Sequence, residues 1–125
     1  MSEGAQTVGA QPHILVAEDE FLVYLALEEE LRAAGYVVVG PFPSLAATQE
    51  AIAREHFDLA LLDINMGGEM AWPVADALIA KNIPVIFLSG YGAGVLPERF
   101  LALPRLAKPY DPALLLREIR RVLQA

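Results

Sequence analysis

The chain contains no cysteine among its 125 residues. This absence excludes disulfide bonds, thiolate metal sites and thiol catalysis, although it fits either redox compartment. Long apolar runs are also absent, because none approaches the roughly 18 consecutive apolar residues that span a bilayer. The sequence has only two histidines, His13 and His56. Neither has a second ligand at a metal-like spacing, so we expect both at the surface, at strand edges.

Positive charge is scarce as well. Nine Lys and Arg residues face sixteen Asp and Glu residues, which gives a formal net charge of −7. A nucleic-acid partner requires clustered basic side chains, and here they are dispersed, so we predict no nucleic-acid binding. Residues 1–11 lack the basic start and apolar core of an export signal. We interpret them as a flexible N-terminal leader and expect a cytoplasmic protein that does not associate with membranes.

The rest of the chain, residues 12–125, has the size of one domain. A hydrophobic fraction of 55% is well above that of disordered chains, so most of the sequence should pack into a single core. Neither an internal repeat nor a linker is visible. The sequence therefore predicts one globular domain behind the short leader.

Short apolar runs alternate with helically spaced ones along this domain. Five alternations predict a doubly wound α/β fold, with a parallel sheet and helices on both faces. The predicted strands are 14–17, 36–39, 57–62, 84–88 and 105–107. The predicted helices run from Phe21 to the stop at Gly35, from the cap Ser44 to about Glu55, from Pro73 to near Asn82, and from Pro112 almost to the end.

Two stretches between these elements are expected to be irregular. Residues 65–69 contain Gly67-Gly68 and predict a loop. Residues 91–104 contain two glycines and two prolines, which leaves room only for a short helix over 98–102. We expect this second stretch to be mobile, with a short or irregular fourth helix.

Polar residues follow four of the predicted strands at the point where each strand ends: Glu18-Asp19, Asp63, Ser89 and Lys108. The carboxyl ends of parallel strands share one edge, and ligands of open α/β sheets bind in the crevice outside that edge. Taken singly, the acids could stabilise a helix start or form a turn, and the lysine could be an ordinary surface residue. Their common position at strand ends favours a site.

The charges of this site indicate which ligand it takes. Three gathered carboxylates repel one another, so the arrangement requires cations. Lys108 supplies one positive charge, and a metal ion would supply two. All-oxygen ligands suit Mg²⁺, which keeps several waters and often bridges to phosphate. A phosphoryl group is then tolerated electrostatically, with the hydroxyl of Ser89 donating to one of its oxygens. The Lys108-Pro109 bond is a candidate for the cis form, which would aim the ammonium into the crevice.

These four motifs, in this order, resemble the receiver domain of two-component response regulators from about His13 to Gln124. The resemblance implies a flavodoxin-like (βα)5 fold with strand order 2-1-3-4-5. It also implies transfer of a phosphoryl group to Asp63 from a phosphohistidine of a sensor histidine kinase or phosphotransfer protein. Mg²⁺ would be held by Asp19, Asp63 and the main-chain carbonyl of Asn65. Glu18 would act mostly through metal-bound water.

The sequence departs from the receiver pattern at two places. Receivers usually carry an aromatic residue three positions before the lysine, where this chain has Arg105, so the usual switch is in doubt. The segment 87–92 resembles stand-alone receivers called FATGUY regulators, in which Tyr91 is a candidate replacement for the aromatic, or else an exposed loop tyrosine. The second departure is Gly67-Gly68 in place of a more usual Pro-Gly, which predicts a looser loop beside Asp63.

The sequence thus predicts a single-domain response regulator without an output domain, because the chain ends after its last helix. It would signal by contact with a downstream protein, and it would promote only its own phosphorylation and dephosphorylation rather than act as an enzyme. The apolar residues from Leu114 to Ile119 fit either the core or a homodimer interface.

One alternative function is that of a degenerate receiver that binds its partner without phosphorylation. Another is a haloacid-dehalogenase-type phosphatase, although Phe21 stands where that family has its second aspartate.

Overall fold

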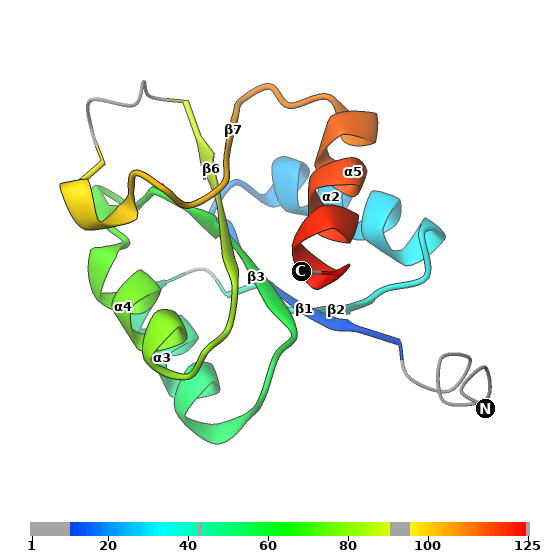
Figure 1. Cartoon of the computed structure of the whole chain (residues 1–125). Coiled ribbons are helices and arrows are strands. Elements are labelled where there is room, and N and C mark those ends of the chain that lie inside the picture. The colour runs from blue at the N-terminus through cyan, green and yellow to red at the C-terminus, as the bar shows by residue number, and fades with distance from the viewer. Residues whose placement is uncertain (1–10, 43, 91–95, 125) are drawn as a thin grey trace.

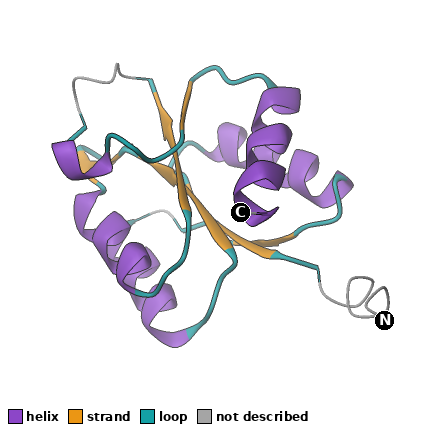
Figure 2. Cartoon of the chain, viewed as in Figure 1, coloured by secondary structure: helices purple, strands orange, loops and turns teal. Residues whose placement is uncertain are grey.

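A computed structural model describes residues 11–42, 44–90 and 96–124 of the chain. Its centre is a parallel sheet of five strands in the order β2-β1-β3-β6-β7 (Figures 1 and 2). The strands are β1 His13–Ala17, β2 Val37–Val39, β3 Leu59–Asp63, β6 Val85–Ser89 and β7 Arg105–Ala107. Counted along the chain, these five strands have the predicted order 2-1-3-4-5, so the predicted fold is confirmed.

Four α-helices in the described part of the chain cover the two faces of this sheet (Figure 1). Helices α2 (Phe21–Ala33) and α5 (Pro112–Gln124) lie on one face, and α3 (Leu45–Arg54) and α4 (Trp72–Ala80) lie on the other. Successive side chains of a strand point to opposite faces, so a sheet covered on both sides needs continuous apolar strands. The two faces accordingly carry separate apolar cores.

Local sequence signals place the helix ends as predicted. The hydroxyl of Ser44 accepts a hydrogen bond from the N–H of Ala47 at 3.1 Å and caps α3. Pro73 lies in the first turn of α4, where its missing N–H is not needed. Gly35 has φ 95° just after α2, a conformation that favours glycine at a helix end. None of the helices in the described residues is long and apolar enough to cross a membrane.

The predicted loop over residues 65–69 is wrong. Strands β4 (Asn65–Met66) and β5 (Glu69–Met70) pair in antiparallel fashion and form a small hairpin. Gly67 and Gly68 form its two-residue turn with φ values of 63° and 92°. Two successive positive φ angles match the turn that closes the tightest hairpins, and only glycine adopts them at little cost. The glycine pair therefore gives this segment regular structure.

The segment before β7 contains the short fourth helix, a 3-10 turn over Glu98–Phe100 labelled η2. Phe100 is fully buried, and its ring centroid lies 5.6 Å from those of both Trp72 and Phe87. The exposed ion pair between Arg99 and Asp76, at 2.9 Å, joins η2 to α4. Residues 91–95, including Tyr91, lie outside the described residues.

The predicted dimer surface on α5 is partly in the core. Leu115 and Ile119 are fully buried against the sheet, whereas Leu114 is 42% exposed. The homodimer stays a prediction, for which the structure leaves Leu114 as an exposed apolar side chain.

Phe100→Ala should lower the free energy of unfolding by about 3–5 kcal/mol, because it removes a buried ring and leaves a cavity between Trp72 and Phe87. Leu101→Ala is the matched control. Leu101 is 50% exposed, so its truncation should change stability by about 0.5 kcal/mol or less. Urea unfolding followed by circular dichroism measures both variants, and equal losses would contradict the packing described for η2.

Candidate phosphoryl-acceptor site

The sheet brings the predicted site residues to one edge. Glu18 and Asp19 follow β1, Asp63 ends β3, Ser89 ends β6 and Lys108 follows β7. Strand β3 lies between β1 and β6, and β7 pairs with β6. The four strand ends are therefore adjacent, although ninety residues of sequence separate the first from the last.

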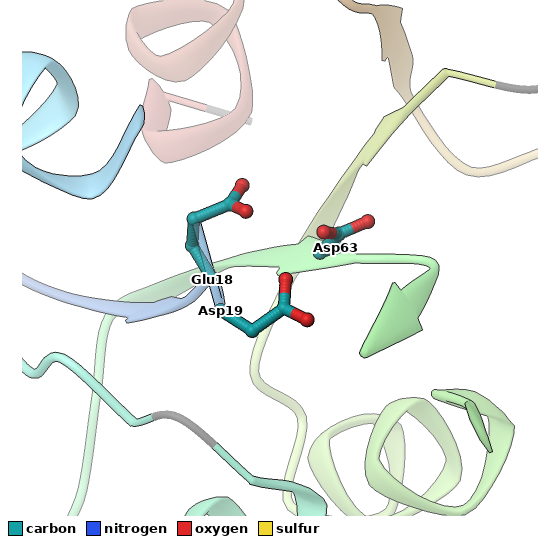
Figure 3. Close-up of side chains that lie close together, drawn as sticks. All are labelled: Glu18, Asp19 and Asp63. Carbon is teal, nitrogen blue, oxygen red and sulfur yellow. The ribbon is translucent and has the colours of Figure 1, made fainter. Parts of the chain in front are cut away.

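Three carboxylates gather at this edge (Figure 3). Glu18, Asp19 and Asp63 each offer an oxygen, and these oxygens all lie within 4.8 Å of one another. Glu18 and Asp63 are buried, whereas Asp19 is exposed. In the described part of the chain, this is the one group of three or more histidine, cysteine or acidic residues with such spacing. Its donors are all oxygens, which are the ligands of hard cations such as Mg²⁺.

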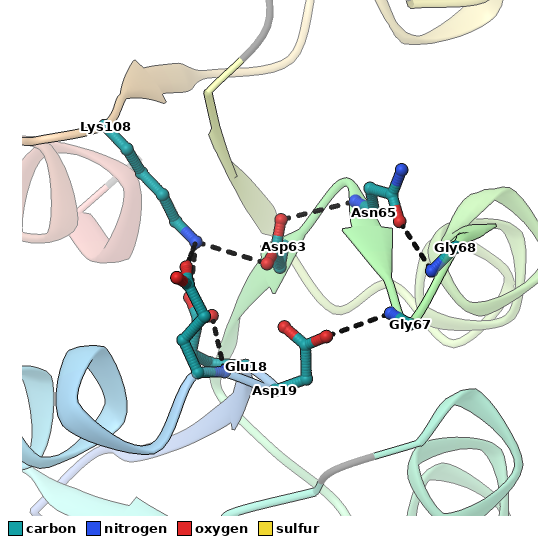
Figure 4. Close-up of polar contacts among 8 residues, drawn as sticks. Glu18, Asp19, Asp63, Asn65, Gly67, Gly68 and Lys108 are labelled. Carbon is teal, nitrogen blue, oxygen red and sulfur yellow. Dashed lines mark hydrogen bonds and ion pairs between the residues drawn. The ribbon is translucent and has the colours of Figure 1, made fainter.

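The ammonium group of Lys108 faces three carboxylates (Figure 4). Its Nζ lies 2.8 Å from Glu18 Oε1, 3.2 Å from Asp63 Oδ2 and 3.3 Å from Glu20 Oε1. The Lys108–Pro109 peptide bond is cis, the form for which the sequence made it a candidate. The sequence did not single out Glu20, although its place directly after the acidic pair was the available signal.

The β4–β5 hairpin holds two of the carboxylates through its backbone (Figure 4). The N–H of Gly67 donates to Asp19 Oδ2 at 2.9 Å, and the N–H of Asn65 donates to Asp63 Oδ1 at 3.3 Å. The side-chain oxygen of Asn65 in turn accepts from the N–H of Gly68 at 2.9 Å. These contacts were not predicted from the sequence, because residues 65–69 were expected to form an irregular loop.

Burial and mutual repulsion shape the protonation of the site. Burial raises the pKa of Asp63, and the neighbouring Asp19 adds to this effect, while Lys108 opposes it. Burial also raises the pKa of Glu18, with Lys108 again opposing and Asp63 contributing. Burial alone would lower the pKa of Lys108, but the contacts with Glu18 and Asp63 outweigh it and raise that pKa. Lys108 therefore holds its proton more tightly, whereas burial makes the charged forms of Glu18 and Asp63 less favourable in the fold than in water.

A cavity of about 640 Å³ opens above these groups. Asp63 and Lys108 line it, so a ligand in the cavity reaches the carboxylate and the ammonium together. The other described lining residues are Asp19, Glu20, Asn65, Gly67, Gly68 and Gly90. Glu18 and Ser89 do not line it. Glu18 is buried in contact with Lys108, and Ser89 is fully buried where β6 ends, next to the strand that carries Asp63.

The two histidines lie away from this site, at the start of β1 and just before β3. Their side chains are 53% and 73% exposed, which confirms their predicted place at the surface. His13 Nδ1 and His56 Nε2 lie 4.0 and 3.8 Å from the carboxylate of Asp58. Asp58 also accepts a hydrogen bond from the backbone N–H of His13 at 2.7 Å, so this carboxylate links two neighbouring strands at the opposite edge.

Comparison with known proteins agrees with this geometry. The response regulator receiver domain family matches residues 14–120, and the chain belongs to that family. Members of this family are signalling domains of two-component systems rather than classical enzymes. The chain is 30% identical over 102 residues to the transcriptional regulatory protein PdtaR of Mycobacterium tuberculosis, a match that covers 78% of this chain and 50% of PdtaR. The chain thus spans about half the length of the curated relatives it matches.

Two solved structures illustrate the likeness of fold. SdrG from Sphingomonas melonis Fr1 superposes with a TM-score of 0.80 at 32% identity, covering 92% of this chain and 98% of SdrG. The receiver domain of the sensor histidine kinase PA1611 from Pseudomonas aeruginosa PAO1 gives a TM-score of 0.77 at 23% identity, covering 93% and 100% of the two chains. That second structure holds a magnesium ion in its active-site cleft.

Asp63→Asn should stabilise the fold at pH 7 in the absence of divalent ions, because it removes a buried carboxylate whose ionised form is unfavourable. We expect a gain of about 0.5–2 kcal/mol, the usual size for a stabilising substitution. Because the pKa of Asp63 is raised in the fold, the wild-type chain binds its proton more tightly when folded. Its stability should therefore rise as the pH falls from neutral through the raised pKa, and the advantage of Asp63→Asn should shrink over the same range.

Thermal unfolding in EDTA between pH 4 and pH 8 measures this difference. Asp76→Asn is the control, since it removes a carboxylate from an exposed ion pair and should give no gain. An Asp63→Asn variant that is less stable than wild type at pH 7 would contradict the electrostatic account of the site.

Proposed function

We propose that this chain is a response regulator that accepts a phosphoryl group onto Asp63 in a Mg²⁺-dependent reaction. The donor would be a phosphohistidine of a sensor histidine kinase or of a phosphotransfer protein. The observation that carries the proposal is the position of the Asp63 carboxylate, which lines the cavity within 4.8 Å of two further carboxylates and 3.2 Å from an ammonium group. A lone acidic cluster would bind a cation, but the added lysine also accommodates an anion.

The donor set fits a magnesium ion. Asp19 and Asp63 offer carboxylate oxygens toward the cavity, and Asn65, which also lines it, would add its main-chain carbonyl. Glu18 Oε1 is buried and pairs with the Lys108 ammonium at 2.8 Å, and Glu18 does not line the cavity. Because Glu18 is set back from the cavity, it would act on the ion through metal-bound water rather than as a direct ligand. When bound, the ion would offset the negative charge of the incoming phosphoryl oxygens.

Three residues of this chain have proposed roles in the phosphoryl transfer: Asp63, Lys108 and Ser89. A carboxylate oxygen of Asp63 attacks phosphorus, and a mixed anhydride bond forms as the phosphorus–nitrogen bond of the donor breaks. The imidazole nitrogen leaves with the electron pair of that bond, and a proton on the other ring nitrogen makes the leaving group a neutral imidazole. Lys108 binds a phosphoryl oxygen through its ammonium group, and Ser89 at the end of β6 would donate its hydroxyl to another.

The proposed receiver comprises residues 12–125, preceded by a leader over 1–11. We propose that phosphorylation changes its contacts with a downstream protein.

The second candidate is a receiver that binds its partner without phosphorylation. The exposed Arg105, at the position where receivers usually carry an aromatic residue, favours that alternative. A phosphatase of the haloacid dehalogenase type has less support, because Phe21 replaces its second aspartate and is 64% exposed at the start of α2.

Incubation with acetyl phosphate and Mg²⁺ should add the mass of one phosphoryl group to the intact protein. EDTA should prevent this gain, and Asp63→Asn should abolish it because the variant lacks the attacking carboxylate. Asp58→Asn, at the opposite edge of the sheet, is the matched control and should still be modified. Steady release of phosphate from added phosphoesters would favour the phosphatase, and no mass gain under any condition would favour the phosphorylation-independent receiver.

Lys108→Ala should retain Mg²⁺ binding, because the carboxylates remain, but it should lose the conformational response to phosphorylation. Amide hydrogen exchange of the β6 end and of the residues up to Pro104, with and without acetyl phosphate, measures that response. Lys81→Ala serves as the control, because Lys81 contacts backbone carbonyls near the end of α3 and belongs neither to the cavity lining nor to the acidic cluster. A normal exchange response in Lys108→Ala would contradict the role assigned to the ammonium.

A further inference from the structure

Glu20 is the one carboxylate around Lys108 that is well exposed. Its side chain is 65% exposed, whereas those of Glu18 and Asp63 are 0% and 10% exposed. Glu20 Oε1 lies 3.3 Å from the Lys108 ammonium, and Glu20 lines the cavity above Asp63. The three carboxylates thus differ in how easily each can give up the lysine.

An ammonium group has three N–H donors, and here three carboxylates surround it. A phosphoryl oxygen that binds Lys108 must take the place of one of these acceptors. Glu18 is buried, so loss of its counter-ion would leave an unpaired charge inside the protein. Asp63 is the group to which the phosphorus becomes bonded. The carboxylate of Glu20, by contrast, can return to water at little cost.

We infer that Glu20 is a positioning residue that occupies the place on the Lys108 ammonium which a phosphoryl oxygen takes on phosphorylation. This inference rests on the proposed function and extends it to a residue outside the four receiver motifs. In the unphosphorylated state, Glu20 holds the lysine over the cavity. On phosphorylation it competes with the phosphoryl group, so its removal should strengthen the binding of a phosphoryl group or of its mimic.

The structure separates this role from a structural one. Glu20 is the residue directly before α2, but its side chain makes no capping hydrogen bond to the helix. Its backbone N–H donates to Glu18 Oε2 at 3.1 Å, and a side-chain substitution preserves that contact. Replacing the side chain should therefore leave the helix start and the position of Glu18 unchanged.

The test compares wild type, Glu20→Gln, Glu20→Asp and Glu29→Gln for binding of beryllofluoride, a tetrahedral phosphoryl mimic. Each protein is first titrated with Mg²⁺, and binding is then measured at saturating Mg²⁺ by ¹⁹F NMR of the bound fluorides. Saturation is needed because Glu20 also contributes negative charge that attracts the cation. Glu29 is exposed on α2, the helix that begins directly after Glu20, so Glu29→Gln removes the same charge at a position away from the site.

Glu20→Gln should tighten beryllofluoride binding by about two- to five-fold, the size expected for an exposed ion pair. Glu20→Asp keeps the charge but is one methylene too short for the contact with Lys108, so it should behave like Glu20→Gln. Glu29→Gln should bind like wild type. A wild-type affinity in Glu20→Asp together with tighter binding in Glu20→Gln would mean that only charge at the cavity mouth matters, and this would overturn the inference.

Two further outcomes are distinguishable. Equal or weaker binding in Glu20→Gln, with normal binding in wild type, overturns the role of Glu20 and leaves the proposed function intact. No beryllofluoride binding to wild type at any Mg²⁺ concentration overturns the proposed function itself. Phosphorylation by acetyl phosphate at saturating Mg²⁺ gives an independent reading, since a competing carboxylate should slow it by a similar factor.

Discussion

The contact between the Lys108 ammonium and two buried carboxylates is the interaction on which this site depends. Glu18 and Asp63 lie within 3.2 Å of Nζ, and burial of both acids without a cation would favour their protonation. Removing the lysine would leave both buried carboxylates without a cation, a loss that typically costs about 3–5 kcal/mol. The lysine reaches this position because β7 pairs with β6, and the N–H of Lys108 donates to the carbonyl of Ser89 at 2.7 Å. The edge strand is therefore part of the electrostatics of the site.

Backbone N–H groups of the hairpin also hold two of the carboxylates. Asp19 accepts from Gly67, and Asp63 accepts from Asn65, both on the hairpin that follows β3. Backbone N–H donors at fixed positions need little reorganisation when charge enters a site. Asp19 therefore stays exposed and Asp63 lines the cavity, so both carboxylates are accessible to a cation. Glu18 stays buried in contact with Lys108.

Much of this could be predicted from the sequence, for reasons visible in particular residues. The strands are short apolar runs, and four of the five are followed by a polar residue. The runs therefore predicted the sheet, and the strand ends placed Asp19, Asp63 and Lys108 at a common edge. The hairpin over 65–70 could not be predicted as readily, because Gly67-Gly68 is compatible with a loose loop as well as with a tight turn. The contact of Glu20 with Lys108 depends on where an exposed side chain points, and no periodicity encodes that. The burial of Ser89 likewise depends on how far β6 extends beyond its apolar run.

Arg105 of β7 is paired in register with Phe87 of β6, so the two side chains belong to the same face of the sheet. Phe87 lies two residues before Ser89 in β6, so its side chain points to the same face of the sheet as that of Ser89. Phe87 packs against Phe100 of η2 and against Trp72, which begins α4 directly after the hairpin that holds Asn65. Close-packed aromatic rings transmit displacement because they leave little free volume. Among the described residues, this cluster thus connects the strand end of Ser89, the hairpin beside Asp63 and the segment after residue 95, whereas Arg105 on β7 is turned to solvent and adds no ring to the packing.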